Sequence, residues 1–176
     1  MKRACPIRQS GRKGAELVEF ALVLPLLLLL FAGIFDFGSL FALRQKMTNA
    51  AREGARIVVS TPLSDMSCSS ATPCSIVAAA NAVVQYMTGA GASISCIQPA
   101  SPTTSAGLKW TYSCTNGTSL VINRGYSFSM SGSVLVPATQ VTLVYPIQWW
   151  LMQFLPGFSR FRTITTQTTM QNLVSD

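Results

Sequence analysis

Acidic side chains are the main candidates for chemistry in this sequence, because it contains no histidine. Without histidine, a Ser-His-Asp or Cys-His catalytic arrangement is excluded. No two acids in the second part of the chain form the pair that a two-carboxylate hydrolase needs, and nothing around Lys109 would activate that lysine. We therefore expect neither an enzyme nor a bound cofactor or metal. The six acids are Glu16, Glu19, Asp36, Glu53, Asp65 and Asp176.

Glu19 is the acid whose position is informative, because it stands at the start of a long apolar run. An unpaired charge costs about 2.5–3.5 kcal/mol at the centre of a membrane-spanning helix, and less at the membrane interface. A carboxylate there is stabilised by a cation. If the chain is cut after Gly14, the new amine of Ala15 supplies one, on the same chain or on a neighbour. The alternative is a glutamate at headgroup level without a partner.

Four of the five cysteines follow the apolar run, and the fifth, Cys5, precedes it. An even number of cysteines fits two disulfides formed in an oxidising compartment. Local spacing favours the first with the second and the third with the fourth, although three pairings are possible. A zinc site is the competing interpretation, and the absence of histidine and of a Cys-x-x-Cys pair argues against it. The candidate disulfide residues are Cys68, Cys74, Cys96 and Cys114.

One long helix over residues 15–60 must position Glu19. Its first half, about residues 17–43, is apolar and longer than the roughly 20 residues that cross a membrane. Pro25 predicts a bend just before it. A cleaved secretory signal is the alternative, but the candidate cleavage sites after Ala32 and Ala42 lack a small residue two positions earlier.

The second half of this helix is amphipathic and carries a surface of small residues. Such a surface lets another backbone approach closely. Two partners remain open, the chain's own C-terminal domain and a second subunit. The small residues are Ala50, Ala51, Gly54 and Ala55.

Residues 61–176 are expected to form an exported α+β domain. A helix over about residues 73–88 starts with Thr72 as its cap and Pro73 at its first position. From Ala92 onward the apolar period becomes two, beginning with Ile94 and Cys96, and Asn116-Gly117 predicts a hairpin turn. The fold class is therefore α+β: a long N-terminal transmembrane and amphipathic helix, then one helix packed on an antiparallel sheet. Residues 146–158, rich in aromatics, are core, membrane interface or contact surface.

The formal charge of +7 comes largely from the first 13 residues, which contain no acid. A nucleic-acid site needs its basic residues on a folded face, whereas these flank a hydrophobic segment and favour a cytoplasmic N-terminus. We expect no nucleic acid as a partner, residues 1–14 as a leader, and residues after about 44 outside the cytoplasm. The leader's basic residues are Lys2, Arg3, Arg8, Arg12 and Lys13.

Arg12-Lys13-Gly14, followed by Glu19 and a long apolar helix, resembles the processing site of type IV prepilins and pseudopilins. More narrowly, two segments resemble the opening block of TadE-like pseudopilins of tight-adherence (Flp-type) pilus systems. They are residues 19–27, Glu-Phe-Ala-Leu-Val-Leu-Pro-Leu-Leu, and residues 48–56, Thr-Asn-Ala-Ala-Arg-Glu-Gly-Ala-Arg. The resemblance is specific over residues 12–60 and looser beyond them.

The resemblance implies cleavage after Gly14 by a membrane-bound prepilin peptidase, with Glu19 setting the register and neutralising the amine of Ala15. Asp36 stands where relatives often carry an acid, which implies helix-end solvation or a subunit contact. We expect a minor pilin-like structural subunit, held in the inner (cytoplasmic) membrane by one span, with its domain periplasmic or extracellular. Its partners would be the peptidase, other pilin or pseudopilin subunits, the pilus assembly machinery and membrane lipid. The alternative is an unprocessed single-pass membrane protein whose exported domain binds or scaffolds pilus or secretion assembly partners.

Overall fold

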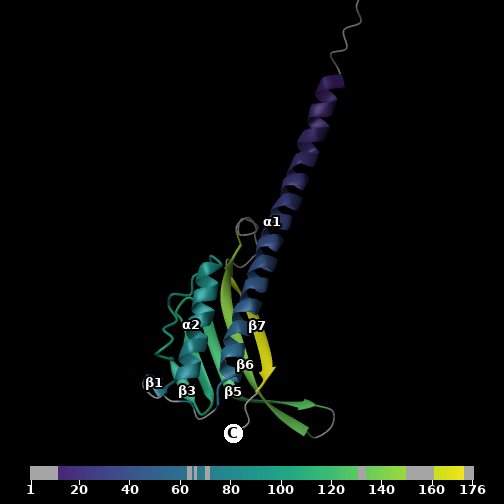
Figure 1. The fold of residues 1–176 in the computed structure, drawn as a ribbon. Coiled ribbons are helices and arrows are strands. Elements are labelled where there is room, and N and C mark those ends of the chain that lie inside the picture. Colours follow the sequence, from purple (N-terminus) through teal and green to yellow (C-terminus); the bar gives the residue numbers. More distant parts are fainter. Residues whose placement is uncertain are drawn as a thin grey trace, which may run out of the picture.

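A long helix projects from a small domain in which a second helix and a sheet pack together (Figure 1). The computed structural model describes residues 12–62, 65, 67–69, 72–130, 134–149 and 161–172. Within these residues the predicted α+β class is confirmed. The elements are α1 (Arg12–Val59), β1 (Ser67–Ser69), β2 (Thr72–Pro73), α2 (Cys74–Gly89), β3 (Thr104–Ala106), β4 (Lys109–Ser113), β5 (Ser119–Met130), β6 (Val134–Gln148) and β7 (Phe161–Gln171).

The main sheet is an antiparallel meander in which β3 to β7 lie side by side in chain order. Alternate residues of its central strands point to one face and are buried, as the period-two pattern predicts. Both helices contribute to the same core as that face. Its inward residues include Trp110, Tyr112, Leu120, Ile122, Val141 and Leu143.

The turn predicted at Asn116-Gly117 is confirmed, and it joins β4 to β5. Gly117 has φ of +88°, which a residue with a side chain adopts at a cost. The strand expected at Ile94 and Cys96 is wrong. Residues 92–98 are irregular, with a turn at residues 95 and 96, where the Ile97 amide donates to the carbonyl of Ile94 at 3.0 Å. The short alternation of apolar and polar residues therefore reflects the burial of Ile94 in the core and does not indicate a strand.

The small residues of α1 pack against α2 in the same chain. Ala50, Ala51 and Ala55 have no exposed surface. A methyl group added to Gly54 would lie 2.7 Å from Cγ2 of Val83 and 3.6 Å from the carbonyl oxygen of Ala79. Of the two partners that the sequence left open, this face is therefore occupied by the chain's own domain.

Helix α2 is held at each end by a charge of the favourable sign. The Asp65 carboxylate accepts a hydrogen bond from the backbone N–H of Ser75 at 2.7 Å, in the first turn. At the other end, Lys46 of α1 donates to the carbonyl of Ala90 at 2.7 Å. An acid at the N-terminus and a cation at the C-terminus both complement the helix dipole.

The predicted start of α2 is correct to within one residue, but its predicted cap is wrong. Pro73 occupies the cap position and no side chain of its own segment caps the helix. Thr72 and Pro73 instead pair with β1 as the short strand β2. Asp65, a residue outside the expected motif, accepts the first-turn hydrogen bond that a hydroxyl cap would have accepted.

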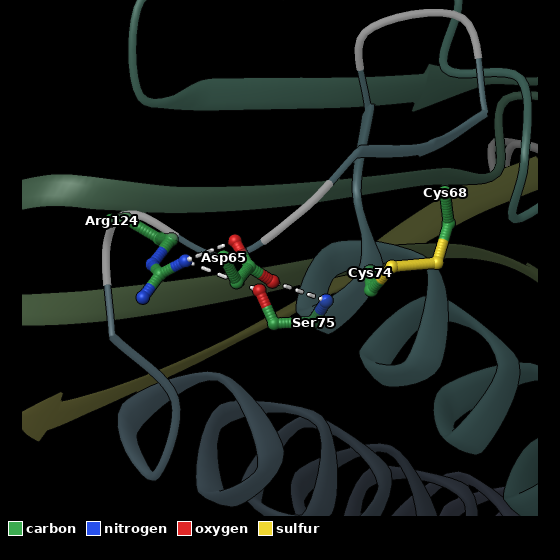
Figure 2. Close-up of a disulfide and its surroundings, with 5 residues drawn as sticks. All are labelled: Asp65, Cys68, Cys74, Ser75 and Arg124. Atoms are coloured by element: carbon green, nitrogen blue, oxygen red, sulfur yellow. Dashed lines mark hydrogen bonds and ion pairs between the residues drawn. A yellow bond between two sulfur atoms is a disulfide. The ribbon is translucent and has the colours of Figure 1, made fainter.

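A buried arginine joins the two helices to the sheet (Figure 2). Arg124 of β5 donates to the carbonyl of Thr61 at 2.7 Å, to the hydroxyl of Ser75 at 3.1 Å and to the carboxylate of Asp65 at 3.4 Å. The side chains of Arg124 and Asp65 are 3% and 11% exposed. This cluster connects the end of α1, the start of α2 and the middle of the sheet.

The described part of the chain contains two disulfides. Cys68 pairs with Cys74, with Cα atoms 4.8 Å apart, and Cys96 pairs with Cys114, with Cα atoms 5.8 Å apart. This is the pairing that local spacing favours. The first disulfide fixes the segment after Asp65 onto the first residue of α2, as Figure 2 shows.

Replacing Gly54 with alanine should lower the free energy of unfolding by about 1–3 kcal/mol, because the new methyl group overpacks against Val83. Denaturant unfolding of the non-reduced, detergent-solubilised protein, followed by tryptophan fluorescence, measures this. Gly38→Ala is the control on the same helix, since a methyl group there meets nothing within 4 Å. In a Val83→Ala background, the Gly54→Ala penalty should largely disappear. A penalty unchanged by Val83→Ala would contradict the contact.

Removing Asp65 and removing Arg124 should lower the free energy of unfolding by different amounts. Asp65→Ala leaves the Arg124 guanidinium buried without its carboxylate and removes the acceptor for the Ser75 amide. We expect it to cost about 3–5 kcal/mol. Arg124→Met removes the buried charge and leaves the Asp65 cap in place, so its cost should be smaller. The same unfolding measurement compares them, and a larger loss in Arg124→Met would contradict this account.

Candidate functional site

The candidate functional site is the projecting half of α1, which no other part of the described chain covers (Figure 1). The most apolar stretch of this helix is not buried inside the protein at all. Large apolar side chains along it are exposed, with Leu22 at 76% and Leu26 at 71%. By length and composition this helix can cross a membrane, as the sequence predicts.

Pro25 does not interrupt this helix. α1 is assigned as a single helix through Pro25, and Figure 1 shows no sharp bend in its projecting half. In that view the bend predicted just before Pro25 is not seen. Proline removes one backbone hydrogen bond, but helices in membranes tolerate it where the freed carbonyl finds a local partner.

The candidate processing site lies at the very start of the described helix. α1 begins at Arg12, three residues before the expected start at Ala15. Gly14 and Ala15 are both exposed, and a methyl group at Gly14 would meet nothing within 4 Å. The bond between them is accessible and lies in the first turn, whose amides have no partner within the helix. Unwinding this turn therefore costs few hydrogen bonds.

Glu19 lies one helical turn after Ala15, on the same face of α1. It lines a shallow groove of about 290 Å³ with Glu16, Phe20 and Val23. Both glutamates are exposed on the outside of the helix. Their negative charge near the helix N-terminus is favoured by the helix dipole. An amine created at Ala15 would thus lie within one turn of the Glu19 carboxylate, and a neighbouring chain could reach it as well.

Asp36 lies where the projecting half of α1, which we term the stem, enters the domain, and it is only 3% exposed. The hydroxyl of Ser39 donates to its backbone carbonyl at 2.8 Å. This burial within a single chain excludes the helix-end solvation expected for Asp36. The acid belongs to the junction between stem and domain.

The aromatic segment begins at this same junction. Pro146, Ile147 and Gln148 end β6 and pair with β7, and the Trp149 ring meets Phe37 of α1 edge-on, with centroids 6.1 Å apart. Residues 150–158 lie outside the described part of the chain. The start of the segment therefore contacts the chain's own stem.

Charged residues beyond the apolar half fall into paired and solvent-facing groups. Arg56 donates to Glu53 at 2.7 Å, and this hydrogen bond lowers the pKa of the Glu53 carboxyl and raises the pKa of Arg56. Both groups are in solvent, so the pair adds little stability. Arg44 and Arg52 are exposed on the same helix.

Sequence reasoning missed the polar cluster around Arg124. A usable signal was present, because Arg124 continues the inward alternation of Leu120 and Ile122. Within the described residues no group of three or more histidine, cysteine, aspartate or glutamate side chains could hold a metal ion. The features of the site are thus an exposed bond between Gly14 and Ala15, an acid one turn later and an uncovered apolar helix.

Comparison with known protein families gives a match to the first part of this chain. The family model described as TadE-like protein matches residues 14–56. None of the curated proteins and none of the solved structures compared with the chain matches it. The matched residues begin at Gly14 and end within the last turn of α1, so they cover the stem and its packing surface and not the sheet. The resemblance seen in the sequence is confirmed: residues 14–56 of this chain are similar to the TadE-like family.

Proposed function

We propose that this chain is a pseudopilin, a minor pilin-like structural subunit for assembly of a tight-adherence (Flp-type) pilus. The observation that supports it most is that the family match and the helix that could cross a membrane cover nearly the same residues. The TadE-like match runs from Gly14 to residue 56, and the uncovered apolar helix occupies the first part of that range. A helix that a folded domain leaves bare is covered either by lipid or by the helices of other subunits.

The proposed sequence of events starts in the inner membrane, with the N-terminus in the cytoplasm and the domain on the other side. A prepilin peptidase cuts after Gly14, and the Ala15 amine balances the charge of Glu19 on its own chain or on a neighbour. Neutralising Glu19 lowers the cost of burying the N-terminal turn in apolar surroundings. The stem then packs with the stems of other pilin or pseudopilin subunits through van der Waals contacts. The role is structural, with no catalytic step.

A second candidate is an unprocessed single-pass anchor whose exported domain binds or scaffolds assembly partners. One observation favours it: the helix already includes residues 12–14, so the uncut chain forms the stem without rearrangement. The two candidates differ in the first residue of the mature protein.

We expect the protein recovered from cells to begin at Ala15 and to carry two disulfides. N-terminal sequencing and intact mass under non-reducing conditions test both expectations together. Gly14→Leu places a branched side chain beside the bond to be cut and should leave the leader attached. A mature protein that retains residues 1–14 would reject the pseudopilin and leave the unprocessed anchor.

Replacing Glu19 with glutamine should spare cleavage and impair assembly, because the isosteric side chain cannot balance the Ala15 amine. Loss of a charge pair at partial membrane depth should reduce incorporation into sheared fibre or pseudopilus fractions by at least about ten-fold. Glu16→Gln is the matched control, since Glu16 lines the same groove but is not one turn from Ala15. Equal incorporation of Glu19→Gln and the parent protein would refute the pairing.

A further inference from the structure

Two grooves adjoin on the surface of α1 where the stem enters the domain. The first is apolar, encloses about 700 Å³, and lies between α1 and β7, with walls that include Phe37, Leu40, Phe41 and Ile164. The second is polar, encloses about 410 Å³, and follows α1 further along, with walls that include Gln45, Thr48, Asn49 and Arg52. Phe41 and Arg44 line both grooves. Together the two grooves form what we term the amphipathic groove.

The polar end of the amphipathic groove is positively charged. Arg44 and Arg52 line it, and none of its lining residues is acidic. Among the described residues the ion pairs are Glu53–Arg56 and Asp65–Arg124, so neither groove arginine is in one. Lys46, the other cation on this stretch, donates to Ala90 and belongs to the α2 contact. Two guanidinium groups facing solvent in a groove match a phosphate, which accepts paired hydrogen bonds from arginine.

The two ends of the groove lie in the order of a membrane's layers. The apolar end is at the end of the apolar run, and Arg44 is the first basic residue after it. Arg52 follows eight residues later, roughly 12 Å along the helix axis. Trp149, packed on Phe37, has the amphipathic ring that favours the membrane interface. The apolar end therefore reaches hydrocarbon depth while the arginines reach the phosphate and headgroup layer.

We infer that the amphipathic groove binds one anionic phospholipid of the phosphatidylglycerol class. An acyl chain occupies the space between α1 and β7, and the phosphodiester lies between Arg44 and Arg52. The side-chain amides of Gln45 and Asn49 supply donors and acceptors for headgroup hydroxyls. A zwitterionic lipid would bring its own ammonium group toward the two arginines, so the site discriminates against phosphatidylcholine. The inference depends on the stem lying in a membrane and not on cleavage after Gly14.

The test is native mass spectrometry of the full-length protein in detergent, with phosphatidylglycerol and phosphatidylcholine added in equal amounts. About 1 kcal/mol for each basic residue near an anionic surface corresponds to roughly 30-fold preference for phosphatidylglycerol from two arginines. The Arg44→Gln/Arg52→Gln double variant should lose that preference. Arg56→Gln is the matched control, because Arg56 is already paired with Glu53, and it should retain the preference.

A second variant tests the groove without removing an arginine. Asn49→Asp places a carboxylate in the same groove as the two guanidinium groups, at almost unchanged volume, and should also abolish the preference. Equal retention of the two lipids by the parent protein would overturn the inference. A preference for phosphatidylglycerol that survives in both variants would also overturn it. The same holds if the double variant dissociates a protein dimer while the amount of bound lipid stays the same.

Discussion

The packing of the second half of α1 into the domain core is the contact on which the rest of the structure depends. Met47, Ala50, Ala51, Ala55 and Val58 have no exposed surface, and Gly54 lets α2 approach closely. The same helix leaves its first half bare. One continuous element thus serves two environments, and the change from large apolar side chains to small ones along its sequence marks where one environment replaces the other.

Charged side chains stabilise both ends of α2 and the junction of the two helices with the sheet. Asp65 and Lys46 complement the dipole of α2, and Arg124 connects both helices to the sheet. Burying such a pair is costly, and partners beyond the carboxylate are needed to compensate. The Thr61 carbonyl and the Ser75 hydroxyl supply them. The cluster therefore fixes where α1 ends and where α2 begins, more than it adds stability.

The stem, its TadE-like character and the α+β class were predictable, because long periodic patterns and the Asn116-Gly117 turn act locally. The cap of α2 was not, because Asp65 reaches it from a separate segment, and the hydroxyl of Thr72 matched a local rule that the tertiary fold overrides. Arg124 was missed for a related reason. A charged residue at an inward strand position needs partners, and those of Arg124 lie 49 to 63 residues earlier in the sequence, at Thr61, Asp65 and Ser75. The sequence could not choose the partner of the small-residue face, since Gly54 suits any close backbone.

The unbroken course of α1 from Arg12 to Val59 has a mechanical consequence. Within the described chain no loop separates the bare half of this helix from the half inside the core, so the domain cannot swivel independently of its rod. A pull along the rod reaches the core as sliding of α1 past α2 and the sheet. Many contacts must then yield together, instead of one after another as in peeling. Tilt and load on the rod are therefore transmitted directly to the folded head.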